Sequence, residues 1–337
     1  MLKNLIRRAL PAIAMAMLSA AASAEPIKLK LALVTSDRAL IYLGGVKPFV
    51  DAVNAEAKGS FEIEVYFSGA LGNNPAQQPQ MVADGVADLA FIFPGYSPER
   101  FDDCSVIELP GIFQDAGEAS RVFGRLIAAQ ALSGYDDFYV IGAFASPVES
   151  IHSRRPVASI ADLKGMSVRA SSMTAVAALE RLGMRPVTIP ANRVSEAISE
   201  AALDGAVLPP AMLFEFGVGR VTSFHYLLDI GVMPLALVMN RKKFEGLPAQ
   251  AQDVIRKYSG EWPLTRYLQS YGAATNQVME QLTSNPQRKV IHPSRIDLDQ
   301  AKAAFTAFVD DWAARSQNNR KQLEIVQTEV AKLRASQ

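Results

Sequence analysis

The strongest constraint on the fold is an alternation of strand-like and helix-like segments that occurs twice along the chain. Residues 27–132 alternate short apolar or alternating runs with segments of helical apolar spacing, and residues 138–208 repeat that order. In each block a helix ends near a glycine, and an aspartate close to it precedes a buried strand. The pairs are Gly85 with Asp88 and Asp204 with Gly205. This alternation predicts α/β layers with largely parallel sheets, arranged in two lobes.

We expect a ligand cleft between the lobes, because ligands of such folds bind at the carboxyl ends of strands and between lobes. The predicted first lobe comprises residues 25–147 plus about 235–275. The predicted second lobe comprises 148–234 plus about 276–337, with the C-terminal helices. A long helical region covers 248–283, and Pro263 is predicted to kink it.

The first residues are typical of a cleavable signal peptide. Three basic residues precede the apolar run 9–18, and Ala22-Ser23-Ala24 supplies small residues at a cleavage site. The run is too short to span a bilayer, and no later run reaches the ~20 apolar residues that a span needs. We therefore expect residues 1–24 to be removed and the mature chain to be exported to the periplasm.

Composition and motifs exclude several function classes. The chain has 34 basic and 34 acidic residues without a basic block, so no nucleic-acid partner is expected. The single Cys104 cannot form an internal disulfide, and the three scattered histidines have no metal-ligand spacing. Nucleophile-elbow, P-loop, dinucleotide and zinc-protease motifs do not occur. We expect neither a metal, a cofactor nor an enzymatic activity.

One residue is well placed to bind a ligand. Arg169 ends the strand predicted over 166–169, and a guanidinium can hold a carboxylate with two parallel hydrogen bonds. The ordinary alternative for a single arginine at a strand end is a surface ion pair.

Two ordered sets of motifs are more specific than any single residue. The second block contains Arg155-Pro156-Val157, the run 159–169 (S-I-A-D-L-K-G-M-S-V-R), Leu182-Gly183, 187–190 and Leu203-Asp204-Gly205. Around it lie the motifs 63–67, 69–72, 85–88, 109–113 and 240–248. Over about residues 27–260 the order resembles the solute-binding protein of tripartite ATP-independent periplasmic (TRAP) transporters.

That resemblance implies a two-lobed periplasmic-binding-protein architecture that closes over a small organic acid. It implies that the arginine ending D-L-K-G-x-x-x-R, here Arg169, binds the carboxylate. It also implies that the protein, expected to be a monomer, delivers the acid to the small and large membrane subunits of a TRAP permease.

Departures from sialic-acid-binding members bear on the substrate. Glu149 stands where those members have a second arginine, Phe93 where they have an acidic residue, and Leu208 where they have an asparagine. Hydroxyls of a sugar acid would stay unpaired beside Phe93 and Leu208, at ~1–3 kcal/mol each. Glu149 would repel the second charge of a dicarboxylate. We therefore expect a monocarboxylate with an apolar or aromatic body, with Glu149 accepting a hydrogen bond from a hydroxyl or amine.

Further side chains are candidates for the cleft. Tyr96, Phe214 and Met233 are predicted to line it, with core packing as the alternative role. Ser172 and Asn192 follow strands and are predicted donors, with turn and helix-capping roles as the alternative.

Two other function classes stay open on the sequence alone. One is a binding protein of another transporter type, against which the long C-terminal helical region argues. The other is an exported enzyme acting on a carboxylate, which would need an acid/base or metal constellation.

Overall fold

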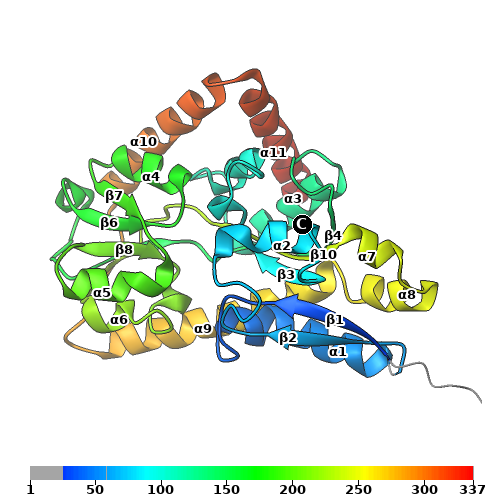
Figure 1. Ribbon diagram of the computed structural model, residues 1–337. Coiled ribbons are helices and arrows are strands. Elements are labelled where there is room, and N and C mark those ends of the chain that lie inside the picture. The colour runs from blue at the N-terminus through cyan, green and yellow to red at the C-terminus, as the bar shows by residue number, and fades with distance from the viewer. Residues whose placement is uncertain (1–25, 58, 337) are drawn as a thin grey trace, which may run out of the picture.

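The computed structural model describes residues 26–57 and 59–336, so the predicted signal peptide lies outside the described residues. The chain forms two α/β units side by side, each built around one sheet, as Figure 1 shows. The prediction of a two-lobed α/β architecture is confirmed.

The first sheet has the strand order β2-β1-β3-β10-β4. Its strands are β1 (Ile27–Ala32), β2 (Phe61–Tyr66), β3 (Leu89–Ile92), β4 (Phe138–Ala145) and β10 (Pro234–Asn240). β1 runs parallel to β2 and β3, whereas β10 runs antiparallel to both of its neighbours.

The second sheet has the order β11-β9-β5-β8-β6-β7. Its strands are β5 (Ser150–Ser153), β6 (Ser167–Ala170), β7 (Arg185–Thr188), β8 (Gly205–Leu208), β9 (Phe224–Tyr226) and β11 (Lys289–Ile291). β6 is parallel to β7 and β8, and β5 is antiparallel to β8 and β9.

Both sheets are therefore mixed rather than largely parallel. The physical reason is that the described chain crosses between the sheets three times, from β4 to β5, from β9 to β10, and from β10 through α9 to β11. The segments of the first two crossings, 146–149 and 227–233, are hydrogen-bonded to each other: the Glu149 amide donates to Gly231 O (2.9 Å) and the Ile230 amide to Glu149 O (3.1 Å). They form a paired linker between the units.

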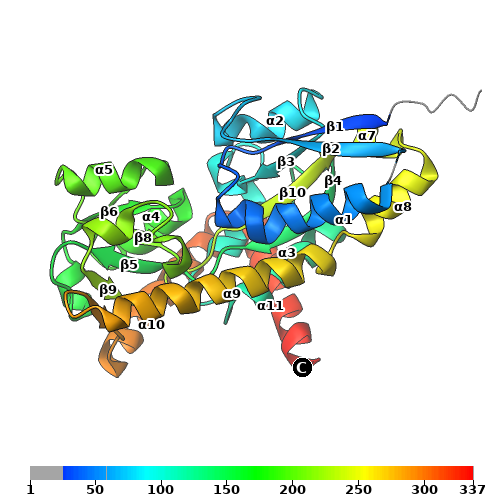
Figure 2. The same cartoon turned by 90° about the horizontal axis from the view of Figure 1, so that it is seen from below.

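Helices cover the sheets on both faces (Figures 1 and 2). The shorter ones are α1 (Lys47–Ala57), α2 (Gln78–Ala83), α3 (Ala116–Ala128), α4 (Met173–Glu180), α5 (Val194–Ser199), α6 (Val218–Val221), α7 (Arg241–Glu245) and α8 (Ala249–Lys257). The long ones are α9 (Glu261–Ser284), α10 (Arg295–Ala314) and α11 (Gln317–Ala335).

Short turns of π- or 3₁₀-helix connect these elements. They are η1 (Tyr42–Val46), η2 (Pro75–Gln77), η3 (Pro94–Tyr96), η4 (Asp102–Glu108), η5 (Ile160–Leu163), η6 (Ala191–Arg193) and η7 (Pro210–Met212).

Helix α9 runs along both units, as Figure 2 shows. The predicted kink at Pro263 is wrong. The helical region breaks instead at Gly260, whose φ of 70° is favourable for glycine, and α9 starts at Glu261. Pro263 thus lies in the first helical turn, where its missing N–H costs no hydrogen bond.

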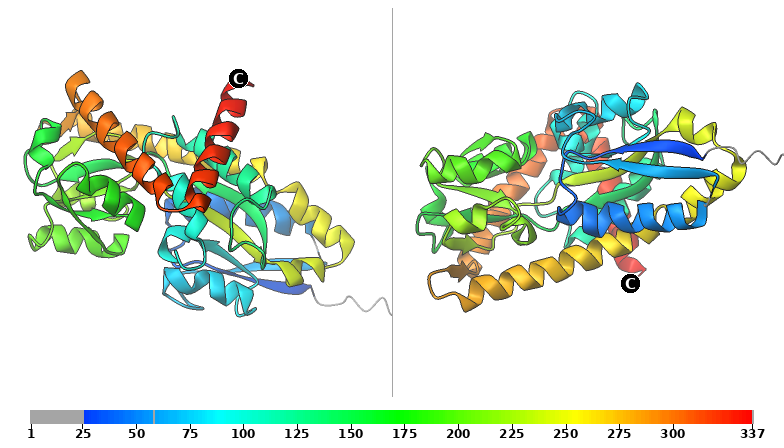
Figure 3. Two further views of the ribbon diagram at one scale, coloured as in Figure 1. Left: turned by 90° about the horizontal axis from the view of Figure 1, so that it is seen from above. Right: turned by 60° about the horizontal axis from the view of Figure 1, so that its bottom comes forward.

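Helices α10 and α11 form a V over the two units, seen from above in the left panel of Figure 3. α10 packs against α4 and η5 of the second unit, whereas α11 packs against α3 and η4 of the first. The assignment of all of 276–337 to the second lobe needs correction for α11, because the buried face of that helix completes the core beside α3.

The core consists of three clusters of buried residues. The largest joins both units and includes Phe123, Val168 and Trp312; a second fills the other face of the first sheet, and a third the other face of the second sheet. Cys104 belongs to the first cluster and is buried, with Sγ 3.3 Å from the Tyr135 hydroxyl. No helix in the described ranges is long and apolar enough to cross a membrane.

Candidate ligand-binding site

Arg169 is a buried cation at the second sheet. It lies on β6 between β7 and β8 and is 2% exposed. Its Nε donates to Ile189 O (3.2 Å), Nη1 to Val207 O (3.0 Å) and Nη2 to the Tyr96 hydroxyl (3.3 Å). All three acceptors are neutral. Among the ion pairs of the described residues, none involves Arg169 within 4 Å, so the surface-pair alternative does not describe it.

Tyr96 brings an aromatic group of the first unit to this guanidinium. It ends η3, which follows β3 after the single residue Phe93, and its ring lies 5.7 Å from that of Phe93. Phe93 in turn lies 5.7 Å from Phe91 in the core. Both Phe93 and Tyr96 are half-buried. The structure thus brings three predicted site residues together, and one hydrogen bond joins the two units here.

Glu149 is part of the paired linker and is 4% exposed. Its carboxylate accepts a hydrogen bond from the Ser171 hydroxyl (2.6 Å), two residues after Arg169. Burial raises the pKa of Glu149, and the nearby charge of Arg169 and the Ser171 bond only partly oppose this. Glu149 therefore lies beside the candidate anchor without forming a direct ion pair with it.

Ser172 contacts a second buried carboxyl that the sequence analysis missed. Its hydroxyl caps α4 by accepting from the Ala175 amide (3.2 Å) and donates to Glu108 of η4. Glu108 is 6% exposed, and burial raises its pKa to about 7, with the charge of Glu149 adding to the rise. The sequence did contain a sign of this buried acid: Glu108 is a single glutamate within the apolar run 106–109. An acidic side chain is rarely buried in a core unless it has a partner or a function.

Gly95 makes this arrangement sterically possible. A Cβ at Gly95 would lie 2.6 Å from Glu108 Oε1 and 3.5 Å from Ser172 Cβ. A cavity of about 380 Å³ borders Gly95, Glu108 and Ser172 and extends to the corner between α10 and α11 at Arg315. Arg169 is not among the residues that line it.

The other four predicted site residues have no bond or ring contact with Arg169, Tyr96, Phe93, Glu149 or Ser172 among the described residues. Leu208 is buried in the third core cluster, and Phe214 packs against that cluster, 5.6 Å from the Arg288 guanidinium. Met233 is half-buried beside the second cluster. Asn192 is exposed on η6, and α5 has no side-chain cap, so the helix-capping alternative for Asn192 is wrong.

The described residues contain no group of three or more histidine, cysteine, aspartate and glutamate side chains that could hold a metal ion. The buried side chains around Arg169 are suited instead to hydrogen bonding and charge pairing.

Comparison with known families decides the classification. The family model described as bacterial extracellular solute-binding protein, family 7, matches residues 31–316. The chain belongs to this family. The resemblance to TRAP solute-binding proteins is confirmed by solved structures of such proteins, as follows.

A marine metagenome TRAP solute-binding protein from an unidentified microbe, described as specific for aromatic acid ligands, is 26% identical to this family 7 protein, with a TM-score of 0.83. The match covers 91% of this chain and 99% of that one, which was solved with metahydroxyphenylacetate. A TRAP solute-binding protein of Rhodoferax ferrireducens T118, solved with copurified benzoate, shares the fold at 24% identity and a TM-score of 0.80, covering 91% and 98% of the two chains.

A curated relative is the C4-dicarboxylate-binding periplasmic protein DctP of Rhodobacter capsulatus. It is 24% identical over 253 residues, which cover 72% of this chain and 74% of that one. Such relatives are solute-binding proteins of transport systems, and this one is named as periplasmic.

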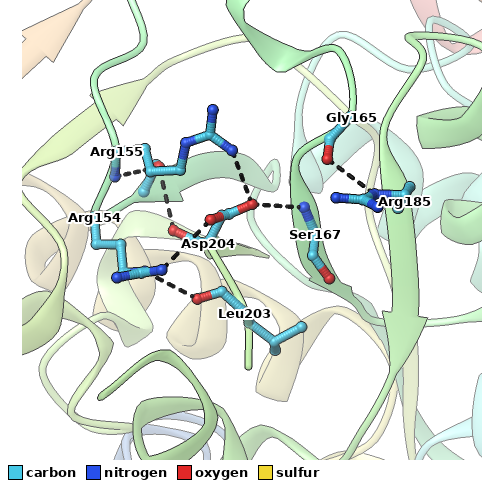
Figure 4. Close-up of polar contacts among 8 residues, drawn as sticks. Arg154, Arg155, Gly165, Ser167, Arg185, Leu203 and Asp204 are labelled. Atoms are coloured by element: carbon cyan, nitrogen blue, oxygen red, sulfur yellow. Dashed lines mark hydrogen bonds and ion pairs between the residues drawn. The ribbon is translucent and has the colours of Figure 1, made fainter. Parts of the chain in front are cut away.

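In this family 7 protein Asp88 and Asp204, the aspartates that precede a buried strand in each half of the chain, have a structural role. Asp204 accepts from the Ser167 amide (2.9 Å) and pairs with Arg155 Nη1 (3.1 Å) and Arg154, as Figure 4 shows. Asp88 does the same in the first unit: it accepts from the Lys30 amide (2.8 Å). Each aspartate precedes a central strand and binds the backbone of the neighbouring strand.

Proposed function

We propose that this protein captures a small monocarboxylate with an apolar or aromatic body in the periplasm and delivers it to the membrane subunits of a TRAP permease. Arg169 is the carboxylate anchor in this proposal. The observation that carries it is the burial of a guanidinium whose contacts are all neutral.

A buried cation without a close anion is a costly arrangement, and an incoming carboxylate would relieve that cost. Arginine has five N–H groups, of which the three hydrogen bonds to Ile189, Val207 and Tyr96 use one each. One N–H on each Nη atom is left for a ligand. The backbone carbonyls fix the plane of the guanidinium, which favours recognition of a planar carboxylate.

The aromatic body of the ligand is supported by two lines of evidence. Tyr96, which is bonded to the guanidinium, and Phe93, whose ring lies 5.7 Å from that of Tyr96, present two half-buried rings. The marine relative was solved with metahydroxyphenylacetate and also with 3-hydroxybenzoate, both of them aromatic acids with a phenol group. Glu149 would accept a hydrogen bond from such a hydroxyl.

The remaining predicted residues complete this proposal. Met233 and Phe214 would supply apolar surface to the ligand body, with Leu208 packed behind them in the core, and Asn192 would supply a donor at its edge. Ser172 would act through Glu108, to which it donates its one hydroxyl proton. A dicarboxylate, suggested by the name of the Rhodobacter relative, is disfavoured because Glu149 would repel a second charge.

A thermal-shift assay tests the proposal. The probes are benzoate, 3-hydroxybenzoate, succinate and the neutral analogue benzamide. A ligand at about 100 times its Kd adds ~2.7 kcal/mol of stability. We expect the two aromatic monocarboxylates to raise Tm, with a smaller rise for succinate and none for benzamide. Stabilisation by benzamide equal to that by benzoate would refute carboxylate anchoring.

Replacing the anchor gives a sharper test. Arg169→Ala should abolish the Tm increase given by the aromatic acids, whereas Arg220→Ala, at an exposed arginine on α6, should keep it. Circular dichroism of both variants without acid checks that each is folded. An unchanged acid-induced shift in folded Arg169→Ala would show that the anchor is elsewhere.

A further inference from the structure

Two buried carboxyls are held by the two residues that directly follow β6, the strand that carries Arg169. Ser171 donates to Glu149 and Ser172 donates to Glu108, so one short segment between β6 and α4 contacts both acids. The acids come from different elements, the paired linker and η4. Among the ion pairs of the described residues, neither acid has a lysine or arginine within 4 Å.

Arg315 and Asp102 line the cavity beside Glu108, one of each sign, and among the ion pairs of the described residues neither is paired with Glu108. The charges that act directly on the two acids are then one positive and one negative. Arg169 on β6 is the cation that acts on Glu149, and Glu149 itself is the carboxylate that acts on Glu108. Of the other titratable groups nearby, Cys104 on η4 has a pKa raised by burial, and Asp229 of the linker has its carboxylate bonded to the Gly231 amide.

A ligand carboxylate at Arg169 would add another buried negative charge to this group. Arg169 can balance only one of the three, and an uncompensated buried charge costs several kcal/mol. Taking up a proton removes most of that cost, because a neutral carboxylic acid keeps its hydrogen bonds to the serines. A carboxyl group next to a like charge is the group that gains the proton.

We propose that the site binds its organic acid together with a proton, which is taken up by the Glu149–Glu108 pair. The proposal rests on the proposed function, since it needs a carboxylate at Arg169. It makes the two glutamates specificity-determining residues: a monoanion requires one proton, whereas a dianion would require a second and is bound less well.

The pKa values of the two acids in the ligand-free protein also favour proton uptake. Burial raises the pKa of both Glu149 and Glu108, that of Glu108 to about 7, so near neutral pH a proton is readily exchanged. Because the two acids interact, the proton belongs to the pair rather than to either residue.

Isothermal titration calorimetry of the mature protein tests this directly. Benzoate and 3-hydroxybenzoate are titrated at pH 7.5 in phosphate and in Tris, whose ionisation enthalpies differ. The slope of binding enthalpy against ionisation enthalpy gives the number of protons taken up. We expect a slope of roughly one half to one proton, and a Kd that increases by up to about tenfold per pH unit above pH 7.5.

Variants identify the groups that take up the proton. Glu108→Gln and Glu149→Gln should each reduce the slope, and the double variant should bring it close to zero. The matched control Glu245→Gln, at an exposed carboxylate on α7, should leave it unchanged.

The outcomes separate the two proposals. Acid binding with zero slope and a pH-independent Kd in the wild-type protein would overturn proton uptake and leave the proposed function standing. An unchanged slope in the double variant would assign the proton to another group and overturn the role of the pair. Absence of binding for both acids would overturn both proposals.

Discussion

Replacing Glu108 by glutamine should make the protein more stable at alkaline pH. Glu108 is buried on η4 and accepts a hydrogen bond from Ser172, which the amide oxygen of glutamine can also accept. The substitution keeps the size of the side chain and removes its charge at every pH. The free energy of unfolding of the variant relative to the wild type then reports the cost of ionising this carboxyl in the fold.

The magnitude follows from the pKa. Burial raises the pKa of Glu108 from the ordinary 4.5 to about 7. Each tenfold change in proton affinity is worth about 1.4 kcal/mol, so ionisation in the folded protein costs about 3 kcal/mol more than in the unfolded chain. A group with a raised pKa contributes its full stability below pH 4.5, and that contribution is lost as the pH rises through 7. Between pH 5 and pH 8, the variant should therefore gain about 2 to 3 kcal/mol relative to wild type.

Urea denaturation at pH 5, 6, 7 and 8 measures this difference. Only its change with pH matters, because any constant effect of the amide cancels. Glu245→Gln serves as the control for loss of one exposed carboxylate. A difference between Glu108→Gln and wild type that stays constant across this range would refute the reasoning, since Glu108 would then ionise in the fold as it does in the unfolded chain.

Two further predictions concern the second sheet. Asp204→Asn should cost about 0–1 kcal/mol, because it loses exposed ion pairs such as that with Arg155 but keeps an oxygen for the Ser167 amide; Asp204→Ala should cost ~1–3 kcal/mol more. Equal losses in urea denaturation would contradict this. Burial lowers the pKa of His152 to about 3 and of His225 to about 4, so their contribution to stability is complete above pH 6.5 and is lost as the pH falls toward 4. In urea denaturation, the double variant His152→Gln/His225→Gln should lose less free energy of unfolding than the wild type between pH 7 and pH 5. Equal losses in the two proteins would show that the two histidines do not cause the acid destabilisation.

Much of the fold could be predicted because local patterns and packing agree. The run 27–32 alternates, and its Leu29 and Leu31 are fully buried in β1. The mixed strand directions could not be predicted, because β5 and β10 follow crossings between sheets, and a crossing leaves no periodicity in the sequence. The sequence offers two places where the long helical region could be interrupted, Gly260 and Pro263. The interruption lies at Gly260, because glycine readily adopts the positive φ found there.

The candidate site was predicted in part. Arg169 was found from its place at a strand end and from a family motif. Its partners Ile189 and Val207 could not be found, since they act through backbone carbonyls that carry no side-chain signal. Glu108 was missed because its meaning depends on Ser172, 64 residues away, and only the fold brings the two side chains together.

The contacts of Arg169 also limit what the anchor alone can contribute. A hydrogen bond to a charged group is worth about 1.5–3 kcal/mol, and the bond from Nη2 of Arg169 to the Tyr96 hydroxyl already belongs to this class. An acid that displaces the Tyr96 hydroxyl from Nη2 exchanges one such bond for another, so the net gain from that N–H is at most about 1.5 kcal/mol. Burying 100 Å² of apolar ligand surface contributes about 2.5 kcal/mol. The guanidinium therefore restricts the site to acids, while contact of the ligand body with Phe93 and Tyr96 must decide which acid binds most tightly.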